Sequence, residues 1–346
     1  MCYYSNEETD IPAVGLLNFS RIEQKVPKYY KNKDINLYNT CYINASIQCL
    51  LRLDDFVKNL LKFQGGDLLS ATKNLINDMR IKKACSVFFI KEAMGEKNDI
   101  YNGNDQGDAN EFITNYLNDL IEETKGTSNF NWTCSKKDEK YFNTFYNKFI
   151  QRKGKSFILD LFYGVTKTET YCKNCETTSI KYNAFNILEI PIYEDDQKFN
   201  YKKNLDMNLK ELLSKFISEK KGEDEKCLTC KKYLYSKISI NNLPKCLIIY
   251  FKRSYSNNII NKIDIPKSIN LEKYILDKSL NNMDNYFYHL KGVIFYSYSK
   301  AKVSHYKAAC LVNNEKWYYF NDNYYDSDVA FRLFQDDNPI LLFYEN

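Results

Sequence analysis

The chain has 346 residues, 44% hydrophobic and 27% charged, which suits a globular protein with one large domain or two modest ones. Its net charge of +5, from 49 basic and 44 acidic side chains, is too small to indicate binding to nucleic acid or a membrane surface. The opening residues lack the features of a signal peptide, and no apolar run approaches the ~18 residues of a membrane span. The 11 cysteines, an odd number, then predict a reducing compartment, the cytosol or the nucleus.

The first 33 residues show no periodic pattern of apolar side chains. Pro12, Gly15 and Pro27 interrupt them, and they end in a cluster of lysines and tyrosines. We predict an irregular N-terminal lead-in over residues 1–33, with no functional site.

Cys41 stands at the start of an amphipathic pattern. The apolar residues that follow it have the spacing of one helix face: Ile43, Ile47, Leu50, Leu51 and Val57. A helix N-terminus carries partial positive charge and unpaired N–H groups, so we expect the pKa of this thiol to be lowered. A buried structural cysteine is the commoner alternative, and the helix pattern alone does not decide between the two.

Further helical patterns cover residues 56–79, with a break at Gly65 and Gly66, and residues 112–121. Asp108 and Glu111 lie one turn apart at the start of the second pattern. They either complement the helix dipole or bind a cationic ligand. Residues 128–155 are polar and aromatic without periodicity, and we expect a loop or a short helix there.

Four cysteines form two C-x-x-C pairs, Cys172 with Cys175 and Cys227 with Cys230, among short strand-like runs that begin at residue 156. In a reducing compartment this spacing is typical of a tetrahedral zinc site, and four thiolates leave no open position, so the metal would be structural. Unrelated core cysteines are the weaker alternative. Between the pairs we predict an amphipathic helix over residues 209–216 and a charged loop over residues 219–226.

The chain has only two histidines, so the choice of a general base for a catalytic thiol is narrow. His289 has the pattern of an incidental strand residue. His305 precedes Asn313 and Asn314, a hairpin turn signal. Reflecting the chain about that turn places His305 opposite Asn321 or Asp322, either of which can orient an imidazole.

These stretches resemble the motifs of the ubiquitin-specific proteases, a family of papain-like deubiquitinases. The cysteine box G-L-x-N-L-G-N-T-C-Y-M-N-S-x-L-Q-C-L matches at Asn36, Leu37, Asn39, Thr40, Cys41, Tyr42, Asn44, Gln48, Cys49 and Leu50. The boxes Q-x-D-A-x-E-F, L-P-x-x-L-x-I-x-x-K-R and G-H-Y-x-A-Y … W-Y-x-F-D/N-D match around residues 106–112, 243–253 and 304–322. Tyr38 and Ser304 replace family glycines. The resemblance runs from about residue 34 to the C-terminus.

The resemblance implies an α+β papain-like fold. A helical thumb would cover about residues 34–155, zinc-tipped β fingers would lie within 156–250, and a β palm would form the remainder of a catalytic domain spanning 34–346. It also implies a structural zinc on the four cysteines and no cofactor for catalysis. The expected partner is ubiquitin or a ubiquitinated protein, and the reaction is hydrolysis of the bond at ubiquitin's C-terminal glycine.

The resemblance also assigns roles to single residues. Cys41 would be the nucleophile and His305 the general base, with Asn321 orienting the base and Asp322 beside it. Asn36 would help to hold the oxyanion. The carboxylates Asp108 and Glu111 would border the groove for ubiquitin's arginine-containing tail. Two alternatives stay open: a catalytically weak or inactive ubiquitin-binding scaffold, and a protease for another ubiquitin-like modifier.

Overall fold

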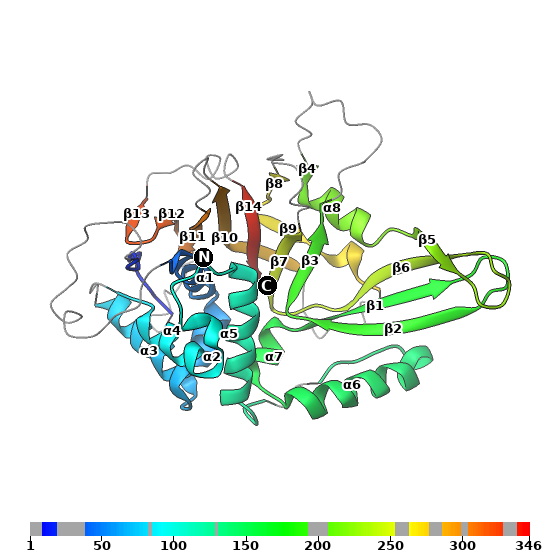
Figure 1. Cartoon of the computed structure of the whole chain (residues 1–346), viewed down its shortest axis with the longest axis horizontal. Coiled ribbons are helices and arrows are strands. Elements are labelled where there is room, and N and C mark those ends of the chain that lie inside the picture. The colour runs from blue at the N-terminus through cyan, green and yellow to red at the C-terminus, as the bar shows by residue number, and fades with distance from the viewer. Residues whose placement is uncertain are drawn as a thin grey trace, which may run out of the picture.

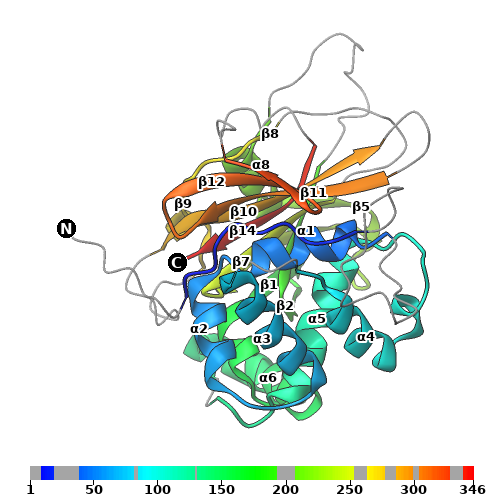
Figure 2. The same cartoon turned by 90° about the vertical axis from the view of Figure 1, so that its left-hand side faces the viewer.

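The computed structural model of the chain describes residues 9–18, 39–81, 85–128, 131–192, 207–252, 263–276, 286–298, 304–327 and 338–346. Helices gather at one end, a broad sheet lies over them, and a second, narrower sheet projects to the other end (Figures 1 and 2). We call these parts the thumb, the palm and the fingers. The predicted α+β fold class is confirmed.

The thumb is built around one fully buried helix, α1 (Cys41–Leu50). α1 packs against palm strands on one side and against α5 (Ala109–Glu123) on the other. The other thumb helices are α2 (Asp54–Lys62), α3 (Asp67–Arg80), α4 (Phe88–Lys97) and α7 (Phe157–Phe162). The predicted helices on both sides of Gly65 and Gly66 and after residue 108 are therefore confirmed. Short 3-10 turns cover Asp99–Tyr101, Lys136–Asp138 and Glu272–Tyr274.

The palm is an eight-stranded sheet of order β13-β12-β11-β10-β14-β7-β3, with β9 also paired to β10. Its strands are β3 (Ile187–Pro191), β7 (Cys246–Lys252), β9 (Ser268–Asn270), β10 (Phe287–Tyr298), β11 (Ser304–Val312), β12 (Lys316–Asn321), β13 (Tyr324–Asp326) and β14 (Pro339–Glu345). All pairs are antiparallel except β3 with β7. Strand β14 lies between β10 and β7 and is buried along its whole length, as expected for an interior strand.

The fingers are a four-stranded antiparallel sheet of order β2-β1-β6-β5. Its strands are β1 (Gly164–Tyr171), β2 (Thr178–Phe185), β5 (Lys220–Lys226) and β6 (Tyr233–Asn242). The turns of both hairpins meet at the far tip of the sheet (Figure 1). The predicted amphipathic helix is α8 (Leu209–Phe216), near the short pair β4 (Met207–Asn208) and β8 (Ile263–Asp264).

Two local predictions are wrong. Residues 128–155 contain a full helix, α6 (Glu139–Lys153), instead of a loop or a short helix. The apolar face of this helix is aromatic instead of aliphatic, which is why its periodicity was not recognised. Its rings recur at helical spacing and pack around Trp132 and Tyr182: Phe142, Phe145, Tyr146 and Phe149. The charged residues of the predicted loop at 219–226 form edge strand β5, because backbone pairing with β6 does not require apolar side chains.

Candidate active site

Cys41 is the first residue of α1 and is only 4% exposed. Backbone N–H groups of Tyr306, Tyr42 and Cys41 itself point at its sulfur. Burial nevertheless raises the pKa of the Cys41 thiol to about 12, and the nearby Asp322 carboxylate raises it further. The expectation of a lowered pKa is therefore wrong, because loss of hydration outweighs the effect of the helix N-terminus.

His305 lies at the start of β11, beside the peptide N–H of Tyr306 that reaches the thiol. Its Nε2 is 2.6 Å from Oδ1 of Asn321, at the end of β12. Because a carbonyl oxygen only accepts, Nε2 donates this hydrogen bond and Nδ1 is the nitrogen that can take a proton. The imidazole is thus fixed by its neighbour and keeps one basic nitrogen.

The hairpin turn between β11 and β12 brings His305 within hydrogen-bond distance of Asn321. Asn313 and Asn314 both have positive φ, at 50° and 57°, and β11 pairs with β12 as far as Ala308 opposite Phe320. The predicted turn is confirmed. Asp322 follows with φ of 55°, and its Oδ2 lies 4.0 Å from His305 Nε2. Both alternatives for the orienting residue are therefore near His305, but Asn321 makes the hydrogen bond.

The second histidine is elsewhere. His289 is an exposed residue of β10 that pairs with Ser268 of β9, and its Nδ1 lies 2.9 Å from the Ser268 hydroxyl. It has no contact with the cluster around Cys41 among the hydrogen bonds of the described residues.

Asp108 and Glu111 differ from one another in surroundings. Asp108 caps α5, since its Oδ1 accepts the N–H groups of Asn110 at 2.8 Å and Glu111 at 3.0 Å. Its Oδ2 accepts the Tyr306 hydroxyl at 3.3 Å, which connects the thumb to the strand of His305. The Glu111 side chain is exposed. The structure therefore gives Asp108 a capping contact and leaves Glu111 on the surface.

Two residues of the matched boxes make contacts at this site that the sequence did not predict. Gln106 of the thumb donates to the Ser304 carbonyl at 3.2 Å and hydrogen-bonds its hydroxyl. Asn44, one helical turn after Cys41, donates to Asp322 Oδ1 at 2.9 Å. The i+3 spacing from Cys41 is a signal that could have revealed Asn44. Asn36 and Tyr38 lie outside the described residues.

The four predicted metal ligands meet at the tip of the fingers. The sulfurs of Cys172, Cys175, Cys227 and Cys230 all lie within 4.8 Å of one another. Two of the sulfur–sulfur distances, Cys172 to Cys230 and Cys175 to Cys227, are 3.4 Å. A tetrahedral zinc with Zn–S bonds of about 2.3 Å separates its sulfurs by about 3.8 Å. The donor set therefore fits zinc in both chemistry and size.

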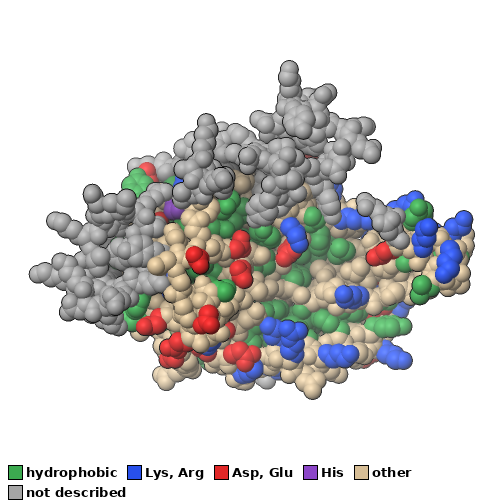
Figure 3. Space-filling view, viewed as in Figure 1, with side chains coloured by type: hydrophobic (Ala, Val, Ile, Leu, Met, Phe, Trp, Pro, Cys, Tyr) green, Lys and Arg blue, Asp and Glu red, His purple; other side chains and the backbone are tan. Residues whose placement is uncertain are grey.

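In each C-x-x-C turn, backbone N–H groups lower the pKa of the first cysteine, which favours the thiolate that a metal binds. Backbone N–H groups of Cys230 and Thr229 lower the pKa of Cys227 to about 6, and those of Asn174 and Cys175 lower the pKa of Cys172. The turns close through Glu176 and Lys231, both at positive φ. Four exposed lysines lie within or next to these turns: Lys173, Lys226, Lys231 and Lys232. Figure 3 shows Lys and Arg side chains gathered at this end of the molecule.

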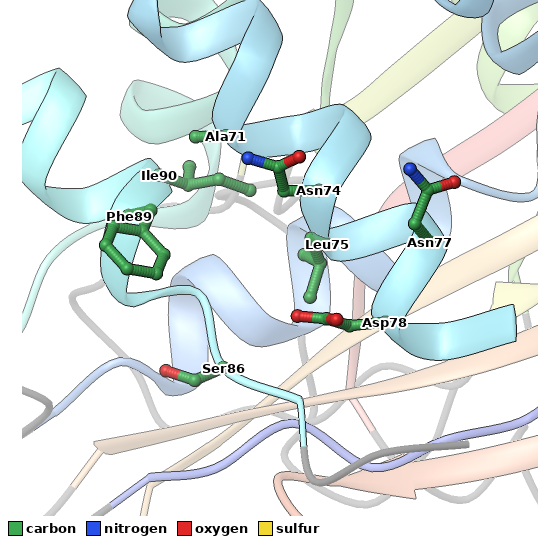
Figure 4. Close-up of a pocket in the computed structure, with 8 residues that line it drawn as sticks. All are labelled: Ala71, Asn74, Leu75, Asn77, Asp78, Ser86, Phe89 and Ile90. Atoms are coloured by element: carbon green, nitrogen blue, oxygen red, sulfur yellow. The ribbon is translucent and has the colours of Figure 1, made fainter. Parts of the chain in front are cut away.

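A separate cavity of about 320 Å³ lies between α3 and α4 (Figure 4). Its lining mixes apolar side chains such as Leu75 and Ile90 with the polar groups of Asn74 and Asp78. It contains none of the predicted site residues. Over the part of the chain that the structure describes, no helix combines the length and the apolar character needed to cross a bilayer.

A cysteine at a helix start, next to the strand of a histidine whose ring an amide orients, is the arrangement of papain-like cysteine hydrolases. The sequence profile of the ubiquitin carboxyl-terminal hydrolase family matches residues 33–344, and the chain belongs to this family. The predicted family is thus confirmed.

Relatives in other organisms agree with this assignment. Ubiquitin carboxyl-terminal hydrolase Usp2 of Drosophila melanogaster is 26% identical over 90% of this chain and 34% of its own length. Ubiquitin carboxyl-terminal hydrolase 3 of Mus musculus is 24% identical over 83% of this chain and 63% of its own length. This chain therefore spans about a third to somewhat under two thirds of these relatives.

Solved structures share the fold. The SAGA Ubp8/Sgf11/Sus1/Sgf73 DUB module bound to ubiquitin aldehyde matches with a TM-score of 0.67 and 18% identity, over 98% of this chain and 70% of that chain. The Ubp8-Sgf11-Sgf73-Sus1 SAGA DUB module matches with a TM-score of 0.65 and 17% identity, over 98% of this chain and 68% of that chain. The thumb, palm and fingers predicted from the sequence are confirmed at the level of the fold.

Proposed function

We propose that the chain is a thiol-dependent deubiquitinase that hydrolyses the isopeptide or peptide bond at the C-terminal glycine of ubiquitin. The observation that carries the proposal is the 2.6 Å bond between His305 Nε2 and Asn321 Oδ1, which leaves Nδ1 basic beside the strand that reaches Cys41. Family membership and the ubiquitin-derived ligand of a matching module support the choice of substrate.

In the proposed reaction, His305 Nδ1 takes the proton of the Cys41 thiol while the sulfur attacks the glycine carbonyl carbon. Because burial raises the pKa of that thiol to about 12, the attack needs a base to take its proton. The imidazolium then protonates the leaving amine, a thioester remains on Cys41, and His305 deprotonates the water that hydrolyses it.

The oxyanion formed in both steps needs donors at the start of α1. We propose that Asn36 supplies one, as the family resemblance implies, together with backbone N–H groups near Cys41. A donor aimed at the developing charge lowers the barrier by about 3–4 kcal/mol. Asn321 orients the imidazole without supplying charge, and Asp322 provides the nearest carboxylate.

We propose that zinc binds Cys172, Cys175, Cys227 and Cys230 and supplies a structural cross-link between the two finger hairpins. Four thiolates complete a tetrahedral shell, so the metal has no part in the reaction. A rigid fingertip would hold the two hairpins in one orientation toward a folded substrate such as ubiquitin.

We further propose that residues 34–346 act as one catalytic domain, in the cytosol or the nucleus, and that part of the predicted irregular lead-in, residues 11–18, packs against it. On the thumb, the exposed Glu111 is available to an arginine of the ubiquitin tail, with Asp108 behind it at the helix start.

A ubiquitin probe with a reactive C-terminus tests the proposal. We expect a covalent adduct with the wild-type chain at Cys41, none with Cys41→Ala, and slower labelling with His305→Ala. Binding without an adduct would favour the inactive scaffold. No binding to ubiquitin, with labelling by a probe built on another ubiquitin-like protein, would favour a different modifier.

A further inference from the structure

The N-terminal segment 11–18 packs against the catalytic helix although it precedes the residues that match the family profile, 33–344. Ile11 and Leu16 are buried, and Leu16 bridges to Cys85. From α1, Gln48 Nε2 donates to the Val14 carbonyl at 2.6 Å, and Arg52 donates to the carbonyl of Ile11. Backbone carbonyls of this segment thus accept hydrogen bonds from polar side chains of, and just after, α1.

The end of the segment reaches the turn after Asn321. The Leu16 N–H donates to the Asp322 carbonyl at 2.9 Å, and Asn18 Nδ2 donates to Asp322 Oδ2 at 3.0 Å. Gly15 lies so close to Asn323 that an added Cβ would be 2.2 Å from its carbonyl oxygen. Only glycine permits this approach, so segment 11–18 packs closely against the turn that contains Asn323.

Two amides therefore hold the Asp322 carboxylate, one on each oxygen: Asn44 from α1 on Oδ1, and Asn18 from the segment on Oδ2. Asn18 is only 3% exposed. The same Oδ2 lies 4.0 Å from His305 Nε2. Asp322 has φ of 55°, a conformation that surrounding contacts must hold in place for a residue other than glycine. The position of the carboxylate nearest the imidazole thus depends on Asn18.

We propose that Asn18 is a positioning residue of the catalytic centre, and that segment 11–18 holds Asp322 at the distance where its charge stabilises the His305 imidazolium. The inference rests on the proposed hydrolase activity. Asn321 is neutral, so a fixed carboxylate behind it supplies the charge that the amide lacks. Loss of the Asn18 donor should lower kcat, and leave KM for ubiquitin substrates nearly unchanged.

The test is steady-state kinetics on a fluorogenic ubiquitin substrate. Asn18→Leu, which keeps the side-chain size, should lower kcat by roughly ten- to a hundredfold and change KM by less than about twofold. The matched control is Asn241→Leu: Asn241 is also a buried asparagine, and it donates to the Thr133 carbonyl at 3.1 Å beside the fingers. This control should lower the melting temperature and leave kcat unchanged. If Asn18→Leu does not fold, Asn18→Ala replaces it.

A double-mutant cycle separates positioning from general damage. Asn18→Asp alone places two carboxylates together and should lower kcat more than Asn18→Leu. Combined with Asp322→Asn, it restores a donor–acceptor pair with reversed roles, so the double variant should be at least as active as Asp322→Asn. Additive losses, or an Asn18→Leu enzyme with wild-type kcat, would overturn the inference alone. An inactive wild-type chain would overturn the proposed function, and this role with it.

Discussion

The catalytic centre and the fingertip are organised in opposite ways. Cys41 lies far in the sequence from His305 and Asn321, which belong to one hairpin, and the three residues are held by a buried helix, that hairpin and side-chain hydrogen bonds. The fingertip consists of two local C-x-x-C turns, and Leu228 within one of them is 89% exposed. The catalytic centre is fixed by the hydrophobic core, while the fingertip depends on its backbone turns and on the proposed zinc that joins its four thiols.

The two sites therefore depend on different interactions in order to form. Cys41 belongs to the larger of the two hydrophobic clusters among the described residues, and none of the four fingertip cysteines belongs to either. Burial of α1 therefore fixes the position of Cys41 without a metal. Removing metal from the fingertip should therefore disturb substrate binding, while removing a catalytic side chain should disturb the reaction alone.

The largest effect is expected at the nucleophile. Cys41→Ala should abolish hydrolysis, since the loss of a nucleophile usually costs several orders of magnitude, while ubiquitin binding and the fold are retained. Turnover with the fluorogenic ubiquitin substrate and binding of ubiquitin would be measured side by side. Cys134→Ala, at a half-buried cysteine before α6, is the control and should keep activity. Turnover of Cys41→Ala within about tenfold of wild type would exclude Cys41 as the nucleophile.

The orienting residue should come next. Asn321→Ala should lower kcat by roughly ten- to a thousandfold, because the imidazole loses its only hydrogen bond from β12, while Asn321→Asp should be tolerated. Asp322→Ala should lower kcat less, since the Asp322 carboxylate lies 4.0 Å from the imidazole. The measurement is kcat/KM of the three variants. If Asp322→Ala has a very low kcat/KM and Asn321→Ala has that of the wild type, Asp322 and not Asn321 orients the imidazole.

Much of both sites could be predicted from the sequence, because short motifs mark chemistry strongly. Local sequence patterns mark the C-x-x-C pairs, His305 and the Asn313–Asn314 turn. The pKa of Cys41 could not be predicted, since a helix start says nothing about how deeply tertiary contacts bury it. The contact of Asn18 with Asp322 was missed for a similar reason: it joins an aperiodic segment to a turn 304 residues away.

The charge state of Cys41 tests whether burial controls the catalytic centre. Its raised pKa favours the neutral thiol in the folded chain, so its contribution to stability is present below pH 9.0 and is lost as the pH rises toward about 12. Alkylation of Cys41 by iodoacetamide should then rise about a hundredfold between pH 7 and 9 without levelling off. In the chain unfolded in urea, alkylation should be half-maximal near the ordinary thiol pKa of 9.0 and should level off above it. A plateau near neutral pH in the folded chain would indicate a resting thiolate–imidazolium pair instead.

Loss of metal should have a smaller effect on the reaction. Cys227→Ser should remove about one equivalent of zinc, lower the thermal stability of the fingers and raise KM severalfold, with kcat within about threefold of wild type. Metal analysis of the purified protein and thermal melting check this. Cys134→Ser serves as the control because it lies outside the cluster. Absence of zinc from the wild type, with all four thiols freely alkylated, would contradict the prediction.

The smallest effects should separate the two carboxylates of the thumb. Glu111 is exposed, so Glu111→Lys should raise KM for ubiquitin substrates about tenfold, the value of one charge-assisted pair, without changing the melting temperature. Asp108 caps α5 and accepts the Tyr306 hydroxyl, so Asp108→Ala should lower the free energy of unfolding by about 1 kcal/mol. Glu92→Lys makes the same charge change at another exposed glutamate of the thumb, on α4, and should leave KM unchanged. If Glu92→Lys and Glu111→Lys raise KM equally, the thumb attracts its substrate by overall charge and not through a contact at Glu111.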